Sequence, residues 1–195
     1  MKQNQTKRKR STLKDAHDFH KSGSYYVGPE HATTDEERIE DIESVSEFLE
    51  SLVKNHFPRT SNLEYAILKC HLIIEYAITE YIRCHSSVVI DREKIKFTFS
   101  QKLEIAYLMG YGTNEPVILP TVETINRVRN QVAHTFSLDR TAVDEIIRIN
   151  SEDYDGIKIE NDRQRVSALR NICKWICGFT SGIIVGEYVA LHGKP

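Results

Sequence analysis

The sequence has few glycines and prolines, and this scarcity argues against a fold that is rich in loops. Of its 195 residues, nine are glycine and five are proline. Both residues disfavour helix interiors, so low counts of both favour helices over an all-β design with many turns. Hydrophobic residues make up 40% and charged residues 28% of the chain. This composition is typical of globular proteins, and the length suits one compact domain with tails.

The sequence also lacks the cysteine spacing and the apolar runs that mark exported or membrane-spanning proteins. None of the four cysteines forms a CxxC pair, and residues 1–20 contain no apolar run. We therefore expect no signal peptide and a reducing, cytoplasmic location. The uncharged run between Lys174 and Glu187 has only 12 residues, against the ~20 that a membrane-crossing helix needs. Cys173, just before this run, and Cys177, within it, are one helical turn apart, which suits core packing or a metal or redox role.

Acidic residues are absent from the start of the chain. Residues 1–14 contain six basic residues and no acidic one, which leaves 20 basic and 28 acidic residues elsewhere, a net charge of −8. We predict that residues 1–32 form a disordered basic tail, whose run at 7–10 contacts phosphates, acts as an address or is simply solvated. Because an acidic body repels nucleic acid, any RNA contact should be local and salt-sensitive.

Hydrophobic periodicity predicts one all-α domain over residues 33–195. The expected helices cover residues 34–56, 61–84, 99–108, 121–136 and 163–191, with a less marked segment at 141–149. Capping-box spacings at Thr34 and Ser61 favour starts for the first two helices. The helix at 61–84 has the widest apolar face and should be the centre of the core. We expect a loop with extended pieces at 86–99 and a connector at 114–120.

Two local patterns each allow a structural and a functional interpretation. His71 and Glu75 lie one helical turn apart, so they form a functional pair, bind a metal or make a hydrogen bond on the helix surface. Gly178, Gly182 and Gly186 recur every four residues in the last helix. Such a glycine ridge permits the close approach of a partner helix, either from this chain or from a second subunit.

The most specific segment is Arg129-Asn130-Gln131-Val132-Ala133-His134. On a helix that turns ~100° per residue, measured from Ile125, Asn130 and His134 fall near ~140° and ~180° on the polar face. Arg129 falls near ~40°, within the apolar stripe.

An arginine in an apolar stripe needs a partner, because a buried unpaired guanidinium is costly. Arg129 therefore either pairs with a core acid such as Glu75 or Glu104, or reaches a cleft beside His134. In that cleft its cation would bind a phosphate, and the imidazole of His134 would move protons near neutral pH.

Arg129, Asn130 and His134 in this order match the RNxxxH motif of the HEPN superfamily, which the chain resembles. Residues 62–76 resemble the long early helix of that fold, and residues 99–110 resemble the short helix that precedes the motif helix in several of its families. The resemblance spans roughly residues 45–136. It implies a HEPN-like up-down bundle of four to five helices for this chain.

The resemblance to RNA-cutting members implies a metal-independent endoribonuclease of a toxin or antiphage-defence type, without a cofactor. It implies a homodimer that cuts RNA in an interface cleft and leaves a 2',3'-cyclic phosphate. Arg129 would stabilise the phosphorane charge, His134 would act as general acid or base, and Asn130 would orient the histidine or the phosphate. Any antitoxin or regulatory protein would be a separate chain. Similarity to the mannitol-operon repressor implies the alternative, a non-catalytic regulatory or scaffold protein.

Overall fold

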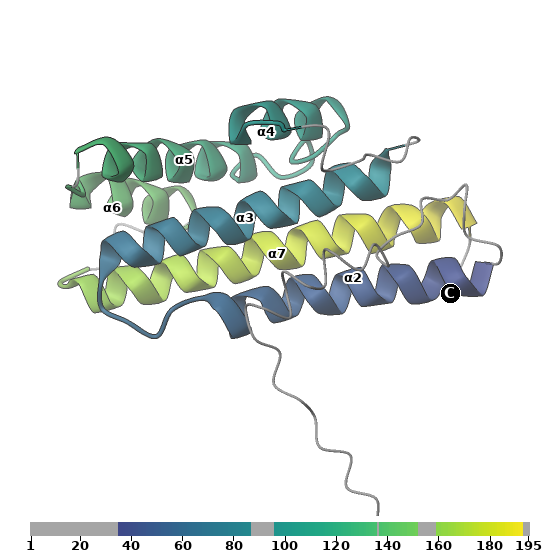
Figure 1. The fold of residues 1–195 in the computed structure, drawn as a ribbon, viewed down its shortest axis with the longest axis horizontal. Coiled ribbons are helices and arrows are strands. Elements are labelled where there is room, and N and C mark those ends of the chain that lie inside the picture. The colour runs from purple at the N-terminus through teal and green to yellow at the C-terminus, as the bar shows by residue number, and fades with distance from the viewer. Residues whose placement is uncertain (1–34, 87–95, 136, 152–158, 193–195) are drawn as a thin grey trace, which may run out of the picture.

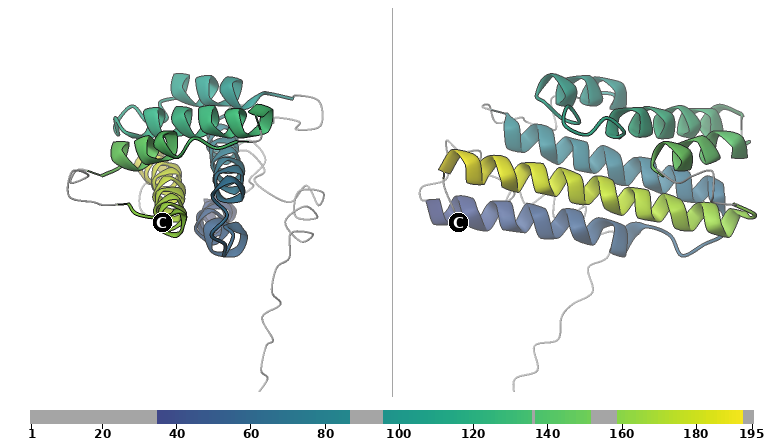
Figure 2. Two further views of the ribbon diagram at one scale, coloured as in Figure 1. Left: turned by 90° about the vertical axis from the view of Figure 1, so that its left-hand side faces the viewer. Right: turned by 180° about the vertical axis from the view of Figure 1, so that it is seen from behind.

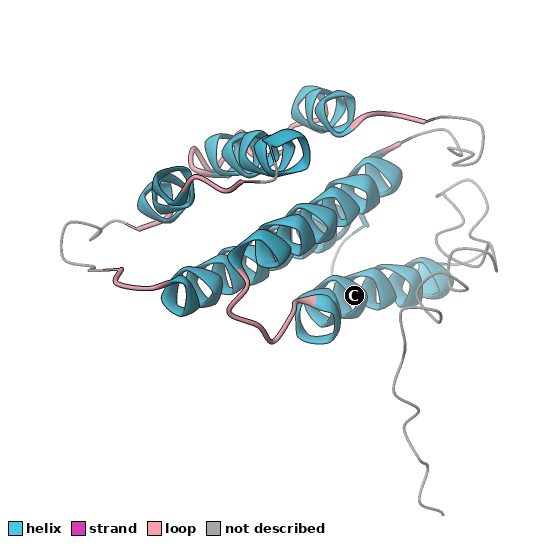
Figure 3. Cartoon of the chain, turned by 60° about the vertical axis from the view of Figure 1, so that its left-hand side comes forward, coloured by secondary structure: helices cyan, strands magenta, loops and turns pink. Residues whose placement is uncertain are grey.

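The computed structural model describes residues 35–86, 96–135, 137–151 and 159–192. All regular elements in these ranges are α-helices (Figure 3), so the expected all-α class is confirmed. They number six rather than four to five, because the weakly patterned segment near residue 145 is a regular helix. The helices are α2 (Asp35–His56), α3 (Leu63–His85), α4 (Phe99–Leu108), α5 (Ile118–Thr135), α6 (Arg140–Ile149) and α7 (Asp162–His192). The basic tail predicted at residues 1–32 lies outside the described residues.

Three long helices, α2, α3 and α7, run side by side, and α4, α5 and α6 lie together on one side of them (Figure 1). The view from behind shows the same arrangement (Figure 2). The colour gradient shows that α2 runs opposite to α3 and α7, and that α5 runs opposite to α3. Because α3 contacts α2, α4, α5 and α7, it is the central helix of the packing.

The central position of α3 follows from its sequence, which is apolar on several sides. Ile67, Ile74, Ile78 and Tyr81 are completely buried. Burying a large apolar side chain contributes roughly 1.5–3 kcal/mol, so a helix with buried faces toward four neighbours stabilises the whole domain. The expectation that this segment is the centre of the core is confirmed.

The start of α3 differs from the capping box that the sequence suggests at Ser61. The N-cap is Asn62, whose side-chain oxygen accepts a hydrogen bond from the Tyr65 backbone N–H at 2.8 Å. The Thr60 hydroxyl in turn accepts a hydrogen bond from the Asn62 backbone N–H at 3.0 Å. Asparagine caps as well as serine does. Residues 59–61 therefore form the bend before the helix, facing α7, instead of the first part of the helix.

The helix α5 begins three residues earlier than expected. It spans Ile118–Thr135, whereas the sequence pattern suggests a start at Thr121 after a connector that ends in Pro120. Proline is tolerated in the first helical turn because the N–H groups there have no intrahelical partner. The added residues lengthen the contact of α5 with the core, since Ile118 is fully buried.

The short helix α4 has clear start and stop signals, as expected. Thr98 and Gln101 form a reciprocal capping box at its start. Gly110 and Gly112 follow its end with φ angles of 99° and 76°, a left-handed backbone that favours glycine. The packing of α4 against α3 then places the Lys102 ammonium in contact with Glu75.

The glycine ridge of α7 does not meet another helix of the described chain. Apart from the adjoining backbone of α7 itself, no described atom lies within 4 Å of the point where a Cβ would stand at Gly178, Gly182 or Gly186. The prediction of an intrachain partner is therefore wrong for these residues, and a second subunit stays a prediction. None of the described helices combines the length and the apolar character needed to cross a membrane.

The two cysteines of α7 pack in the core between α3 and α7. Cys173 and Cys177 are both buried, and the Cys173 thiol donates to the sulfur of Cys70 at 2.8 Å. Burial raises the pKa of the Cys177 thiol to about 12. Thiols held neutral in this way are poor nucleophiles and poor metal ligands, which favours the packing interpretation over the metal or redox one.

Candidate functional site

The motif residues lie on two faces of α5. Val128 and Val132 are buried against the core, His134 is exposed in the last turn, and Arg129 and Asn130 are half-buried between these faces. This placement matches the angles expected from the sequence, because the apolar stripe alone determines which side of α5 faces α3. Within the described residues, no hydrogen bond joins Arg129 to His134.

Arg129 has no carboxylate partner among the described residues. Its Nη1 donates a hydrogen bond to Oδ1 of the neighbouring Asn130 at 2.9 Å. The predicted pairing with Glu75 or Glu104 is wrong. Glu75 is engaged by Lys102, with 2.7 Å between Nζ and Oε1, and Glu104 is exposed on α4. The guanidinium charge is thus oriented by a neutral amide and is not neutralised by an acid.

On α3, His71 is close enough for the charge of Arg129 to lower its pKa, and it is only 2% exposed. Its Nε2 lies 3.2 Å from Oδ1 of Asn126 on α5, and its ring lies 4.3 Å from that of Phe99 on α4. The prediction of a surface hydrogen bond with Glu75 is wrong, since the imidazole is buried and its Nδ1 is 4.0 Å from the carboxylate. Among the described residues, that Nδ1 has no hydrogen-bond partner.

His71 is held neutral by its surroundings. Burial is the largest cause that lowers its pKa, and the positive charges of Arg129 and Lys102 lower it further. The carboxylate of Glu75 and the hydrogen bond to Asn126 act in the opposite direction but do not reverse the shift. A buried imidazole whose pKa is lowered resists protonation, so His71 acts in the cluster as a neutral hydrogen-bonding group.

These contacts form a continuous polar cluster at the junction of α3, α4 and α5. The Nδ2 of Asn130 lies 3.5 Å from Oδ1 of Asn126, so the chain of contacts runs from Arg129 through both asparagines to His71. Its members are His71, Glu75, Lys102, Asn126, Arg129 and Asn130. The cluster contains one guanidinium without a carboxylate partner, which can bind a phosphate, beside an imidazole that is buried and neutral.

Sequence reasoning missed two members of the polar cluster. Asn126 is a polar residue at the edge of the apolar stripe of α5, and this position was a usable signal for a contact with α3. Lys102 had no such signal, because only the packing of α4 across α3 brings it to Glu75. Among the described residues, no group of three or more His, Cys, Asp or Glu side chains is placed to hold a metal ion.

Comparison of the chain with protein-family models, curated proteins and solved structures finds no match.

Proposed function

We propose that this protein is a metal-independent endoribonuclease of the HEPN type. It acts as a homodimer in the cytoplasm, in a toxin or antiphage-defence setting, and cuts RNA in the interface cleft to leave a 2',3'-cyclic phosphate. The observation that carries this proposal is the Arg129 guanidinium, which has a neutral amide and, among the described residues, no carboxylate as its partner. A purely structural arginine in an apolar stripe is expected to be sealed in an ion pair.

Each motif residue has a defined role in this reaction. Arg129 stabilises the charge that develops on the phosphorane, and Asn130 orients its guanidinium through the hydrogen bond described above. His134 is the general acid or base, which its exposure at the end of α5 allows. Its proton transfers activate the ribose 2'-hydroxyl or protonate the departing 5'-oxygen. An antitoxin or other regulator is a separate chain.

A second subunit completes the site, because Arg129 and His134 lie ~140° apart on α5. The face of α5 that carries His134 also exposes Glu123 and Gln131, and these side chains would meet the same face of another copy. A two-fold axis beside this face brings Arg129 of one subunit toward His134 of the other.

The first test is RNA cleavage by the purified full chain with EDTA present. We expect the wild type to cut and His134→Ala to lose activity by at least ~100-fold, the range of general acid–base contributions. Glu104→Ala, which removes an exposed side chain of α4 away from this face of α5, is the control and should cut like the wild type. The assignment fails if the wild type and His134→Ala both leave RNA intact or cut it equally.

The second test asks whether the two residues act across subunits. Arg129→Gln and His134→Ala are each expected to be inactive. When both proteins are mixed and allowed to exchange subunits, half of the dimers are mixed and one of their two sites is intact, so roughly a quarter of the wild-type activity returns. A mixture that stays as inactive as its components contradicts a site built from both subunits.

One observation favours a second candidate, the non-catalytic regulatory or scaffold protein. The contact between His71 and Asn126 shows that polar residues beside the motif hold α5 on α3. In that case Asn130→Ala destabilises the fold by about 1 kcal/mol, the value of a typical hydrogen bond. A non-catalytic protein would leave RNA uncut in the wild type and in every variant, so the cleavage assay with EDTA separates the two functions.

A further inference from the structure

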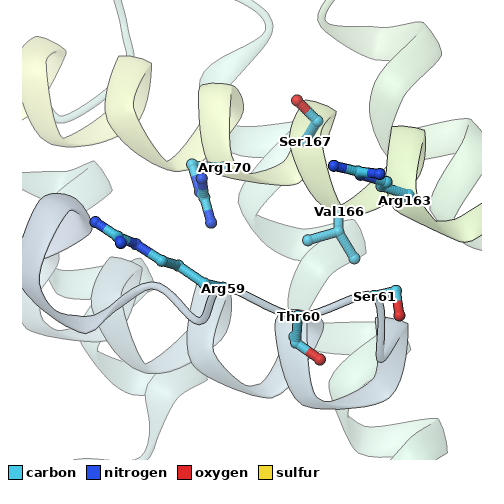
Figure 4. A pocket seen from close by; sticks show the side chains of 7 residues that line it. All are labelled: Arg59, Thr60, Ser61, Arg163, Val166, Ser167 and Arg170. Atoms are coloured by element: carbon cyan, nitrogen blue, oxygen red, sulfur yellow. The ribbon is translucent and has the colours of Figure 1, made fainter.

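A basic pocket lies at a distance from the motif, where the bend between α2 and α3 faces the first turns of α7. It has a volume of ≈560 Å³ and is lined by Arg59, Thr60, Ser61, Arg163, Val166, Ser167 and Arg170. Arg163 and Arg170 project from α7, and Arg59 extends along the facing bend (Figure 4). A second hollow of ≈510 Å³ shares two of these arginines and continues along α7.

The two hollows together form what we call the arginine groove. Its cations are Lys54, Arg59, Arg163, Arg170 and Lys174, and the one acidic residue among those that line it is Glu50. This excess of positive charge contrasts with the net charge of −8 that residues 15–195 carry. Local charge of one sign concentrated in a concave surface attracts counter-ions of the opposite sign.

The arginines of the groove differ from their neighbours in lacking acidic partners. Arg165 on the other side of α7 is neutralised by Asp144 and Asp162. By contrast, Arg59 and Arg163 have no carboxylate within ion-pair distance among the described residues. Their charges are therefore available to a ligand.

Arg170 is held in place without being neutralised. It donates to the backbone carbonyl of Pro58 at 2.8 Å, and its guanidinium lies 5.3 Å from the ring centroid of Phe57. A carbonyl and an aromatic ring orient the side chain but leave its positive charge unpaired. The groove is therefore preorganised for an anion.

The lining residues match the chemistry of phosphate. Guanidinium groups bind phosphate oxygens through paired hydrogen bonds, and the hydroxyls of Thr60 and Ser167 add neutral donors. The groove is long, because Arg163 and Lys174 are eleven residues apart on α7, or ~17 Å along a helix. Cations spread over this length suit a chain of phosphates better than one compact phosphate group.

We propose that the arginine groove binds the sugar-phosphate backbone of single-stranded RNA, a ligand identity that rests on the proposed function. The groove binds the strand without sequence specificity. The Phe57 ring beside it is covered by Arg170 and offers no face for base stacking. This binding site is separate from the cleavage site on α5.

The test measures binding of the full chain to a 2'-O-methyl RNA oligomer, which cannot be cut through its 2'-oxygen, over a range of salt concentrations. The double variant Arg59→Gln/Arg163→Gln changes two exposed side chains. It should reduce the slope of log K against log salt by about 1.4, or ~0.7 for each phosphate that is no longer neutralised. If the double variant and the wild type bind equally at about 1 M salt, this difference in slope makes binding by the double variant roughly 25-fold weaker at 0.1 M salt.

Two further variants make the result specific. Lys96→Gln/Arg148→Gln removes the same charge from exposed positions outside the groove and should bind like the wild type. Equal weakening by both double variants would show bulk attraction and overturn the proposal. Ser167→Glu places a carboxylate inside the groove and should weaken binding at least as much as the double variant; normal binding would also overturn it.

The outcomes separate this site from the cleavage site. If RNA is never cut but the groove variants still reduce the salt slope, the groove stands and the nuclease assignment fails. If RNA is cut normally and the groove variants keep the wild-type slope, the groove is wrong. Inorganic triphosphate should compete only weakly with the oligomer. Direct binding of triphosphate by a protein that binds no RNA would overturn the proposal and assign the groove to a small phosphorylated ligand instead.

Discussion

Replacing His71 with glutamine should make the protein less sensitive to acid. The folded protein holds this imidazole at 2% exposure between Arg129 and Lys102, and burial lowers its pKa below the ordinary value of about 6.5. A histidine with a lowered folded-state pKa contributes stability that is present above pH ~6.5 and is lost as the pH falls toward the folded pKa. In acid His71 is therefore protonated more readily in the unfolded chain than in the folded one.

The size of the effect is limited by one proton. Because linkage allows at most ~1.4 kcal/mol per pH unit, the wild type should lose up to about 1.4 kcal/mol between pH 7.5 and 5.5 through His71 alone. Urea unfolding of the wild type and of His71→Gln at both pH values measures this loss as the difference between their pH dependences. His56, whose pKa burial also lowers, is present in both proteins and cancels.

The comparison at pH 7.5 serves as the control. His71 is neutral there in both states, so any difference between the two proteins reports the changed packing on Phe99 and the altered hydrogen bond with Asn126. If His71→Gln loses as much stability as the wild type on acidification, the imidazole is not a buried neutral group, and the polar cluster is wrongly described.

Two other predictions concern stability. Arg165→Ala should lower the free energy of unfolding by about 2 kcal/mol, because it removes charge-assisted hydrogen bonds to a carboxylate from a side chain that is 11% exposed. Arg140→Ala, which removes a similar ion pair at 62% exposure, should have little effect in the same urea assay; equal losses would contradict the role of burial. Gly182→Ala should raise stability by roughly 0.5–1 kcal/mol, since the new methyl group meets no described atom outside the backbone of its own helix. A concentration-dependent loss of thermal stability would instead place the glycine ridge against a second subunit.

The positions of the helices follow from the sequence because their causes are local. Apolar residues three and four positions apart define the stripe of α5, and this stripe predicts that Val128 is buried and His134 exposed. Capping residues and glycines likewise locate the two ends of α4. The error at the start of α5 has a local cause as well, since Pro120 is compatible both with a connector and with a first helical turn.

The sequence by itself determined the all-α class, the central position of α3 and the exposure of His134, because each depends on the spacing of residues within one helix. Tertiary structure alone decided the partner of His71 and kept the carboxylates of α3 and α4 from pairing with Arg129. The contact between His71 and Asn126 joins residues 55 positions apart, and the arginine groove joins the bend at residues 59–61 to a helix about a hundred residues later. Such long-range contacts depend on how whole helices pack. The crossing angle and the axial offset of two helices are set by all the side chains between them. The spacing of residues along one helix does not contain this information.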